Sequence, residues 1–477
     1  METLAGKTIE EQVGAEALEA FVGGFHGEPI RPGDADYDGA RRIWNGMIDR
    51  HPALIARCRG TPDVMAAVDL AREHGVPLAV RGGGHNVAGS SLCDGGLVID
   101  LSAMNGVWVD PGRRLARVQG GATLGDVDRE TQLYGLATPL GVVSATGVAG
   151  LTLNGGLGHL RRRFGLSCDN LEAVEMVTAD GRPLRASPEE HPDLFWAVRG
   201  GGGNFGVVTA FEYRLHPVGP EVFALFVWHA ADAEGTAMRR FREWSQGAPR
   251  EASVVAVSAF VPELDPFPRE RWGQPCYAFL GTHYGTLEEA ADVLQPLRAG
   301  SDPVADFSGP LRYTELQSLL DADYPDGLSY YWKAAYLDEL SEPVLELIAR
   351  RSAESPSPLT TIDVWHLGGA LAEVPPDATA FWHRDKPYML TIEANWEDPA
   401  ANDRNLAWAR ETFAELQALE AASGGYGNFP GLGEDPAQTL FGDNYERLAE
   451  VKGRYDPGNL FRMNQNIRPQ TGEKAPA

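Results

Sequence analysis

The chain has 477 residues, more than a usual single hydrophobic core contains, so two domains are expected. Hydrophobic residues make up 43% and charged residues 23% of the sequence, which is typical of a globular protein. The net charge of −26 argues against nucleic acid and anionic membranes as partners. The first residues, METLAGK, have neither the basic segment nor the apolar core of a secretory leader, and no apolar run reaches membrane-spanning length. We therefore expect a cytoplasmic enzyme; the sequence leaves its oligomeric state open.

Cysteine and arginine spacing gives two further expectations. The four cysteines are Cys58, Cys93, Cys168 and Cys276. They form no CxxC pair and have no metal-ligand spacing, so we expect buried thiols and no metal site. The only basic cluster, 161–163, is expected to form a solvated face or a local anion contact.

Residues up to about 217 alternate short apolar strands, glycine turns and amphipathic helices. Thr61 and Pro62 are suited to the N-cap and N1 positions of a helix over 63–74, which Gly75 ends. Further elements are expected as strands over 76–80, 97–101, 115–119 and 207–215 and as helices over 122–132 and 192–198. The segment HPVGP at 216–220 is typical of a domain boundary.

The second half has a different pattern. Strands are expected over 254–261, 277–281 and 389–396, and helices over 286–297, 343–352 and 402–422. This pattern favours one antiparallel sheet with helices on a single face. The last fifty residues are again rich in glycine and aromatic residues, and the tail 470–477 is expected to be disordered.

The segment Arg81-Gly-Gly-Gly-His85-Asn86 directly follows an apolar strand. Three glycines allow positive φ and leave a bare backbone that can lie against a large ligand, with one imidazole at its rim. Phosphate-binding loops instead place Lys and Ser/Thr after their glycines. The pattern suits a neutral imidazole held against a planar cofactor, or else a tight turn with an incidental histidine.

Two other glycine-rich segments lead to different predictions about cofactor binding. Residues 201–206 match GxGxxG, but here a helix precedes and a strand follows, which is the reverse of a nicotinamide-binding motif. Residues 141–158 carry small side chains nearly throughout, so their backbone N–H groups can line an extended cofactor. A structural loop close to a sheet is the alternative.

These segments and Tyr455-Asp-Pro-Gly-Asn-Leu-Phe461 occur in an order that resembles the vanillyl-alcohol-oxidase/PCMH flavoprotein superfamily. Within it, the chain resembles the berberine-bridge-enzyme-like branch, and bacterial members similar to 6-hydroxy-D-nicotine oxidase. The resemblance implies an α+β fold with a PCMH-type two-part FAD-binding domain. The two parts of the FAD-binding domain would be residues 1–218 and 425–477. Residues 219–424 would form a substrate domain, whose antiparallel sheet is covered by helices on one face and lies over the flavin ring.

The resemblance also implies how FAD is held. His85 matches the histidine that bonds to the flavin 8α carbon, and Val143 stands where many members carry a second linking cysteine. Since valine cannot form a thioether, a single covalent link is expected, and it would raise the flavin potential. The implied FAD contacts are Arg81, Gly82, Gly83, Gly84, His85, Asn86, Gly141, Ser144, Thr146, Gly147, Gly150, Leu151, Asn154, Gly155, Gly158, Val207, Val208 and Asn428.

Catalytic candidates follow from the same resemblance. Thr146 matches the residue that admits or blocks oxygen; threonine favours an oxidase, although it could merely bond the loop. Asp363 resembles the carboxylate that a sheet strand brings over the flavin, and period-2 alternation places Thr361, Asp363 and Trp365 on one face. Asp363 is the candidate general base, with a raised pKa if buried, or else a solvent-facing acid. Lys333 is the second candidate for a reason of its own: a lysine desolvated among the aromatics at 330–332 could act as a base or bind a ring oxygen. The alternative is that it extends to solvent.

The segment Tyr426-Gly-Asn428-Phe429 departs from the Tyr-x-Asn-Tyr of relatives that use a catalytic tyrosine, because phenylalanine cannot take a proton. We expect an FAD-dependent oxidase that transfers hydride from a C–H bearing OH or NH to flavin and reduces O₂ to H₂O₂. Its substrate is expected to be a small apolar or aromatic molecule. A dehydrogenase, a monooxygenase using a flavin–oxygen adduct, and a non-catalytic flavin-binding protein are the alternatives.

Overall fold

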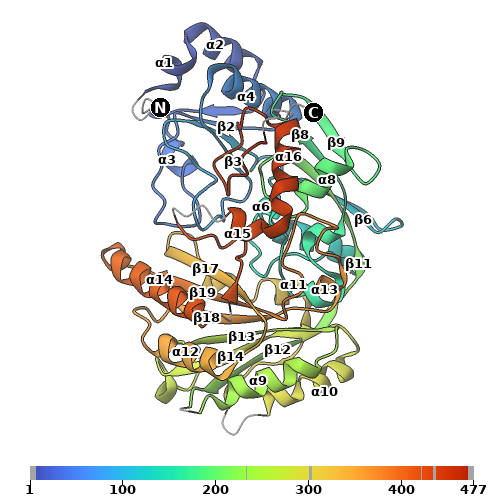
Figure 1. The fold of residues 1–477 in the computed structure, drawn as a ribbon, viewed down its shortest axis with the longest axis vertical. Helices are drawn as coiled ribbons and strands as arrows, with labels where there is room; N and C mark the ends of the chain where they lie inside the picture. Colours follow the sequence, from blue (N-terminus) through green and yellow to red (C-terminus); the bar gives the residue numbers. More distant parts are fainter. Residues whose placement is uncertain (1–6, 233, 300–302, 420–421, 433–436, 471–477) are drawn as a thin grey trace, which may run out of the picture.

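The computed structural model describes residues 7–470 except 233, 300–302, 420–421 and 433–436. The disordered tail expected from the sequence therefore lies outside the described residues, apart from Gln470. Within these described residues, four sheets and the helices around them form an α+β fold, shown in Figure 1.

The first sheet lies near the amino terminus and has the order β1-β2-β4-β3. Its strands are β1 (Glu28–Ile30), β2 (Leu54–Arg57), β3 (Leu78–Arg81) and β4 (Leu97–Asp100), and its helices are α1 (Ile9–Val13), α2 (Ala15–Gly24), α3 (Tyr37–Ala40) and α4 (Thr61–His74). Helix α4 confirms the predicted helix and its end at Gly75, which has a left-handed φ of 66°. Its N-cap is Gly60 and not the expected Thr61, which is the first helical residue, ahead of Pro62.

A second, five-stranded antiparallel sheet has the order β5-β6-β10-β8-β9. Its strands are β5 (Val107–Asp110), β6 (Leu115–Gln119), β8 (Leu171–Val177), β9 (Pro183–Ala186) and β10 (Val207–Arg214); a small sheet pairs β7 (Leu136–Ala137) with β11 (His216–Pro217). The neighbouring helices are α5 (Leu124–Thr131), α6 (Val148–Leu153), α7 (Arg161–Phe164) and α8 (Pro192–Val198). Since α8 precedes and β10 follows the 201–206 glycines, the reversed order predicted for that motif is confirmed.

The middle of the chain forms a nine-stranded antiparallel sheet with the main order β15-β12-β14-β13-β18-β19-β17-β20, and β16 pairs with β12. The strands are β12 (Glu221–Ala230), β13 (Ala252–Phe260), β14 (Pro275–His283), β15 (Pro303–Asp306), β16 (Gly309–Arg312), β17 (Ser329–Leu337), β18 (Thr361–His366), β19 (Tyr388–Trp396) and β20 (Ala422–Ser423). Four long helices cover its outer face: α9 (Thr236–Gly247), α10 (Leu287–Arg298), α12 (Glu342–Ala353) and α14 (Asn402–Ala418). The inner face is turned toward the rest of the molecule, beside α11 (Tyr313–Gln317) and α13 (Ala370–Glu373).

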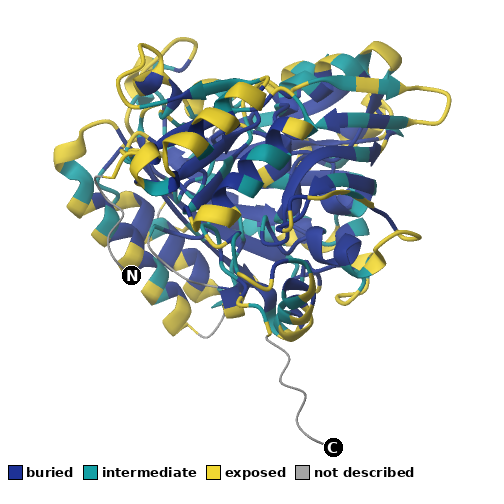
Figure 2. Ribbon diagram, turned by 90° about the horizontal axis from the view of Figure 1, so that it is seen from above, coloured by how far each residue is buried: buried dark blue, intermediate teal, exposed yellow. Residues whose placement is uncertain are grey.

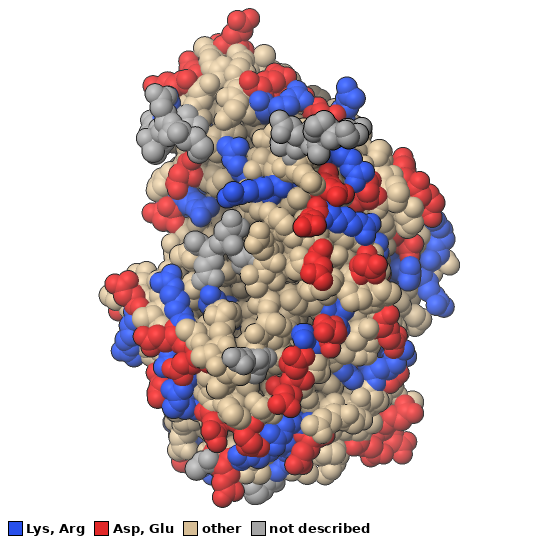
Figure 3. All heavy atoms as spheres, in the orientation of Figure 1, with Lys and Arg blue, Asp and Glu red and all other residues tan. Residues whose placement is uncertain are grey.

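The carboxyl-terminal helices α15 (Ala437–Phe441) and α16 (Tyr445–Tyr455) return to the first half of the chain (Figure 1). Leu448 and Val451 of α16 share a core with Phe195 and Phe211, so segments far apart in sequence build one hydrophobic layer. Figure 2 shows the central strands buried and the outward faces of the helices exposed. Acidic and basic side chains are interspersed on the face in Figure 3. No helix in the described part of the chain is long and apolar enough to cross a membrane.

The basic cluster at 161–163 does not form the solvated face that we expected. The Arg161 and Arg162 side chains are buried. Arg161 donates to the Val254 carbonyl at 2.7 Å, and Arg162 donates to the Ala252 carbonyl at 2.7 Å. Buried guanidinium groups need acceptors, and the β13 main chain supplies them, so this cluster joins the two halves of the molecule. The four cysteines are free and buried, as predicted.

Candidate functional site

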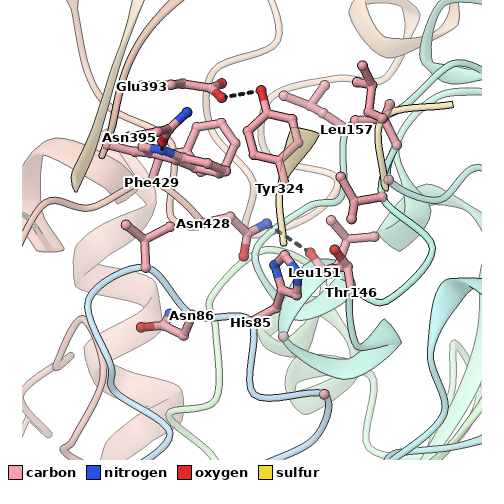
Figure 4. Close-up of a pocket in the computed structure, with 18 of the residues that line it drawn as sticks. His85, Asn86, Thr146, Leu151, Leu157, Tyr324, Glu393, Asn395, Asn428 and Phe429 are labelled. Atoms are coloured by element: carbon pink, nitrogen blue, oxygen red, sulfur yellow. Dashed lines mark hydrogen bonds between the residues drawn. The ribbon is translucent and has the colours of Figure 1, made fainter. Parts of the chain in front are cut away.

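A cavity of about 790 Å³ lies between the nine-stranded sheet and the glycine-rich loops of the first half. Its size is within the range of roughly 300–1,000 Å³ that is usual for small-molecule sites. We call its loop side the floor and its sheet side the roof; Figure 4 shows both. Nearly every element that the sequence singled out contributes to one of them.

Two glycine loops form the floor. Gly82, Gly83 and Gly84 follow β3 and line the cavity, as do Thr146 and Gly147 of the second loop. The loops touch through their backbones: a Cβ on Gly83 would lie 2.5 Å from the Gly147 nitrogen. Only glycine permits this approach, and the result is a floor with little side-chain bulk.

His85 lies at the edge of this floor (Figure 4). Its ring stacks on Trp44, with centroids 4.2 Å apart and planes tilted by 18°. Burial lowers the pKa of His85 to about 4, so the imidazole is neutral at pH 7. Its buried Nε2 atom has no hydrogen-bond partner among the described residues. A neutral imidazole with an unpartnered nitrogen is suited to act as a nucleophile or a ligand.

Strands β18 and β19 bring two carboxyl groups to the roof. In their antiparallel register Thr361 is opposite Glu393 and Asp363 is opposite Thr391, so the two acids are diagonal neighbours on one face. Both acids are buried and line the cavity. Thr361, Asp363 and Trp365 all line it, which confirms the predicted alternation.

Burial raises the pKa of Asp363 well above its ordinary value, and the neighbouring charge of Glu393 raises it further. Burial also raises the pKa of Glu393, but two donors oppose this effect. Tyr324 donates its hydroxyl to Oε2 at 2.8 Å, and Thr391 donates to Oε1 at 2.9 Å. Since these hydrogen bonds favour the carboxylate, Glu393 ionises first and Asp363 keeps its proton.

Lys333 does not reach the cavity. Its neighbour Trp332 lines the roof, so alternation along β17 turns Lys333 to the opposite face, where its ammonium lies 4.1 Å from the ring centroid of Phe413 on α14. This placement corrects the candidate role of Lys333 as a base.

Four residues expected to contact FAD do not line the cavity either. Arg81 pairs with Asp100 at 2.5 Å and holds β3 to β4. Ser144 donates its backbone N–H to Asp321 at 2.7 Å. Gly155 packs against Phe381 and Gly158 against Leu140, where a Cβ on Gly158 would lie 1.6 Å from the Leu140 carbonyl oxygen. All four support the loops that form the floor.

Sequence reasoning missed several polar residues that line the cavity, among them His159, Tyr324, Glu393 and Asn395. Glu393 and Asn395 lie in a strand that is buried on both faces, so alternation between polar and apolar residues was weak. Tyr324 comes from an irregular segment with no periodicity. His159 is buried, and burial together with Arg161 lowers its pKa to about 3.

Asn428 contacts the floor as well. Its side-chain amide donates to the Leu151 carbonyl at 3.2 Å and to the Tyr426 hydroxyl at 2.9 Å. Phe429 meets Trp332 edge to face, with centroids 4.8 Å apart, and closes the cavity beside the roof. A tyrosine base at this position is absent, as the sequence shows.

Comparison with known proteins identifies the family. Residues 52–187 match the family described as FAD binding domain, and residues 425–468 match the family described as berberine and berberine like. The (R)-6-hydroxynicotine oxidase of Paenarthrobacter nicotinovorans is 32% identical over 461 residues, which cover 94% of this chain and 97% of that protein. An FAD-linked oxidoreductase of Dictyostelium discoideum is 31% identical over 462 residues, covering 95% and 97%. This chain belongs to the berberine-bridge-enzyme-like FAD-linked oxidoreductases.

The structure of a family member agrees with this assignment. The crystal structure of 6-hydroxy-D-nicotine oxidase from Arthrobacter nicotinovorans matches with a TM-score of 0.83 at 31% identity, covering 94% of this chain and 98% of that one. The predicted family and α+β fold are therefore confirmed, and the protein is an FAD-linked oxidoreductase. The expected divisions at 218 and 424 remain a prediction.

Proposed function

We propose that this oxidoreductase is an oxidase that carries FAD on a single covalent bond to His85. The observation that carries the proposal is the neutral, unpartnered imidazole at the edge of a bare glycine floor, opposite two buried carboxyl groups. The relative named for the oxidation of (R)-6-hydroxynicotine supports an oxidase. Val143 lines the floor but provides no sulfur, so His85 is the only linking residue in this proposal.

The floor residues are suited to hold FAD. Gly150 lines the cavity, and a Cβ built on it would meet no atom within 4 Å, so its surface is open to a ligand. Gly82, Gly83 and Gly84 also line the cavity and place no side chain beside His85. Val207, Val208 and Asn428 bound the same space. When bound, FAD supplies the two-electron acceptor that takes the substrate hydride and passes both electrons to O₂, which becomes H₂O₂ with two protons.

The carboxyl pair handles the substrate proton. With Glu393 ionised and Asp363 protonated, the pair holds one proton and accepts a second from the substrate OH or NH as the C–H bond breaks. We propose the pair, and not Asp363 alone, as the general base. Tyr324 and Thr391 hold the Glu393 carboxylate in position.

Thr146 is proposed as the residue that admits oxygen. It lines the floor close to His85 in Figure 4, and its side chain is smaller than the leucine that would favour a dehydrogenase. A small side chain leaves space for O₂ beside the acceptor.

The first experiment is acid precipitation of the purified protein. We expect a yellow pellet, a fluorescent band after denaturing electrophoresis, and an intact mass that exceeds the bare chain by one FAD. Flavin recovered entirely in the supernatant would refute the covalent proposal. Screening alcohols and amines under air then tests the oxidase: release of H₂O₂ supports it, and reduction of flavin without reoxidation identifies a dehydrogenase.

A further inference from the structure

The cavity extends well beyond the two carboxyl groups. On the inner face of the nine-stranded sheet its lining continues from β18 over β13 and β14 to β12. We call this extension the apolar arm, and its lining residues are Phe226, Trp228, Val255, Val257, Ala259, Ala278 and Leu280. None of these side chains carries a charge or a free hydroxyl, so the arm excludes charged groups by desolvation.

Strand register fixes the direction of the arm. Asp363 is opposite Val257, Val257 is opposite Ala278, and Ala278 is opposite Trp228. These four residues form one straight row across the sheet, and all four line the cavity. Asp363 and Trp228 are therefore three strand spacings apart, a distance of about 14 Å. Because Val257 and Ala278 are small, the row between Asp363 and Trp228 is a trough.

The outer end of the cavity carries two exposed leucines beside the acidic Glu263. Leu264 and Leu359 line it, although 54% and 40% of their respective surfaces are exposed. Exposed leucines at a cavity mouth are typical of a site that receives apolar ligands.

The charges of the whole lining have one sign. Among the described lining residues none is Lys or Arg. Five are acidic: Glu263, Asp323, Asp363, Glu393 and Glu397. A substrate carboxylate at the roof would find no Lys or Arg among the described lining residues to pair with, whereas the FAD phosphates would face backbone N–H groups of the floor.

We propose that the substrate is an uncharged or cationic amphipathic molecule with a rigid apolar body. Its OH- or NH-bearing carbon lies at the Asp363–Glu393 pair, and its body lies along the row toward Trp228. This inference rests on the proposed function, since the carboxyl pair marks the reacting end. It favours such molecules over small sugars, which would leave the apolar arm unfilled, and over anionic acids, which would find no Lys or Arg among the described lining residues.

Binding of unreactive alcohols tests the arm separately from catalysis. The dimethyl carbinols of benzene and of biphenyl have a tertiary hydroxyl and no C–H to transfer, so titration of the FAD-loaded enzyme, followed by flavin absorbance or calorimetry, measures binding alone. We expect the biphenyl alcohol to bind at least about tenfold more tightly, because its second ring is buried in the trough. A carboxylate on the distal ring of the biphenyl alcohol is expected to weaken its binding at least about tenfold.

Three variants locate the effect. Ala278→Phe fills the middle of the row and should remove the preference for biphenyl, and Ala278→Val, which adds less volume, should remove part of it. Ala103→Phe makes the same change at an exposed position outside the cavity and should keep the preference. Flavin content and thermal melting confirm that each variant folds.

The outcomes separate the inference from the proposed function. Equal affinity for the two alcohols, tight binding of the carboxylate, or an equal loss in Ala103→Phe would overturn the apolar arm. Length-dependent binding combined with no flavin reduction by benzyl alcohol, biphenylmethanol or the matching primary amines would leave the arm intact and overturn the oxidase.

Discussion

The floor and the roof of the cavity are built in opposite ways. The floor consists of backbone, because two glycine loops approach so closely at Gly83 and Gly147 that no side chain fits between them. The roof consists of side chains that alternate along strands and meet across them, as Asp363 and Glu393 do. A floor of backbone can hold a large flat cofactor but has few side chains with which to select a substrate. The side chains of the roof select which small molecule reacts. Cofactor binding and catalysis should therefore respond to different mutations.

The largest expected effect is on the floor. His85→Ala should release all flavin on acid denaturation, while the native variant still binds FAD non-covalently in the glycine cradle. Its flavin should have a lower potential and turn over more slowly. Mass spectrometry and potentiometry measure both effects, and His74→Ala, at an exposed histidine, is the control. A covalent flavin in His85→Ala would assign the link to another residue.

The next effect is on the roof. Glu393→Gln should slow flavin reduction about 10²–10⁴-fold, because the ionised member of the pair is lost, and should leave the covalent flavin and its spectrum intact. Asp363→Asn should also slow reduction, but less, because it leaves the Glu393 carboxylate in place. Stopped-flow reduction under anaerobic conditions gives the rates, with Glu450→Gln, at an exposed acid, as the control. If Asp363→Asn is the slower variant, Asp363 is itself the base.

A smaller effect distinguishes the two half-reactions. Thr146→Leu should slow reoxidation by O₂ by about tenfold or more, with little change in reduction by substrate, because leucine fills space beside the acceptor. Separate stopped-flow measurements of the two half-reactions check this. Equal slowing of both would show that Thr146 shapes the whole site and not oxygen access.

The same contrast explains what the sequence could predict. His85 and its glycines are adjacent in the chain, so one short segment revealed the floor. Glu393 becomes part of the site only through the register of β19 with β18, and Tyr324 enters from an irregular segment. Arg161 looked like a surface charge because its acceptors are the main-chain carbonyls of Gly158, Val254 and His366, and a sequence pattern does not reveal main-chain acceptors.

The smallest effect concerns the hydrogen bond between Tyr324 and Glu393, which lies wholly in the roof. Tyr324→Phe removes a donor that stabilises the carboxylate, so the pKa of Glu393 should rise by about one pH unit, or 1.4 kcal/mol. Since the ionised form accepts the proton, reduction is fast above this pKa and falls as pH decreases through it. The acid limb of the rate profile should therefore move to higher pH, and the rate at high pH should stay within about tenfold of the parent. Anaerobic reduction rates across the pH range measure this shift, and Tyr134→Phe, at an exposed tyrosine, is the control. A uniform loss at every pH would mean that Tyr324 only positions the substrate, and the charge on Glu393 would then not govern the rate.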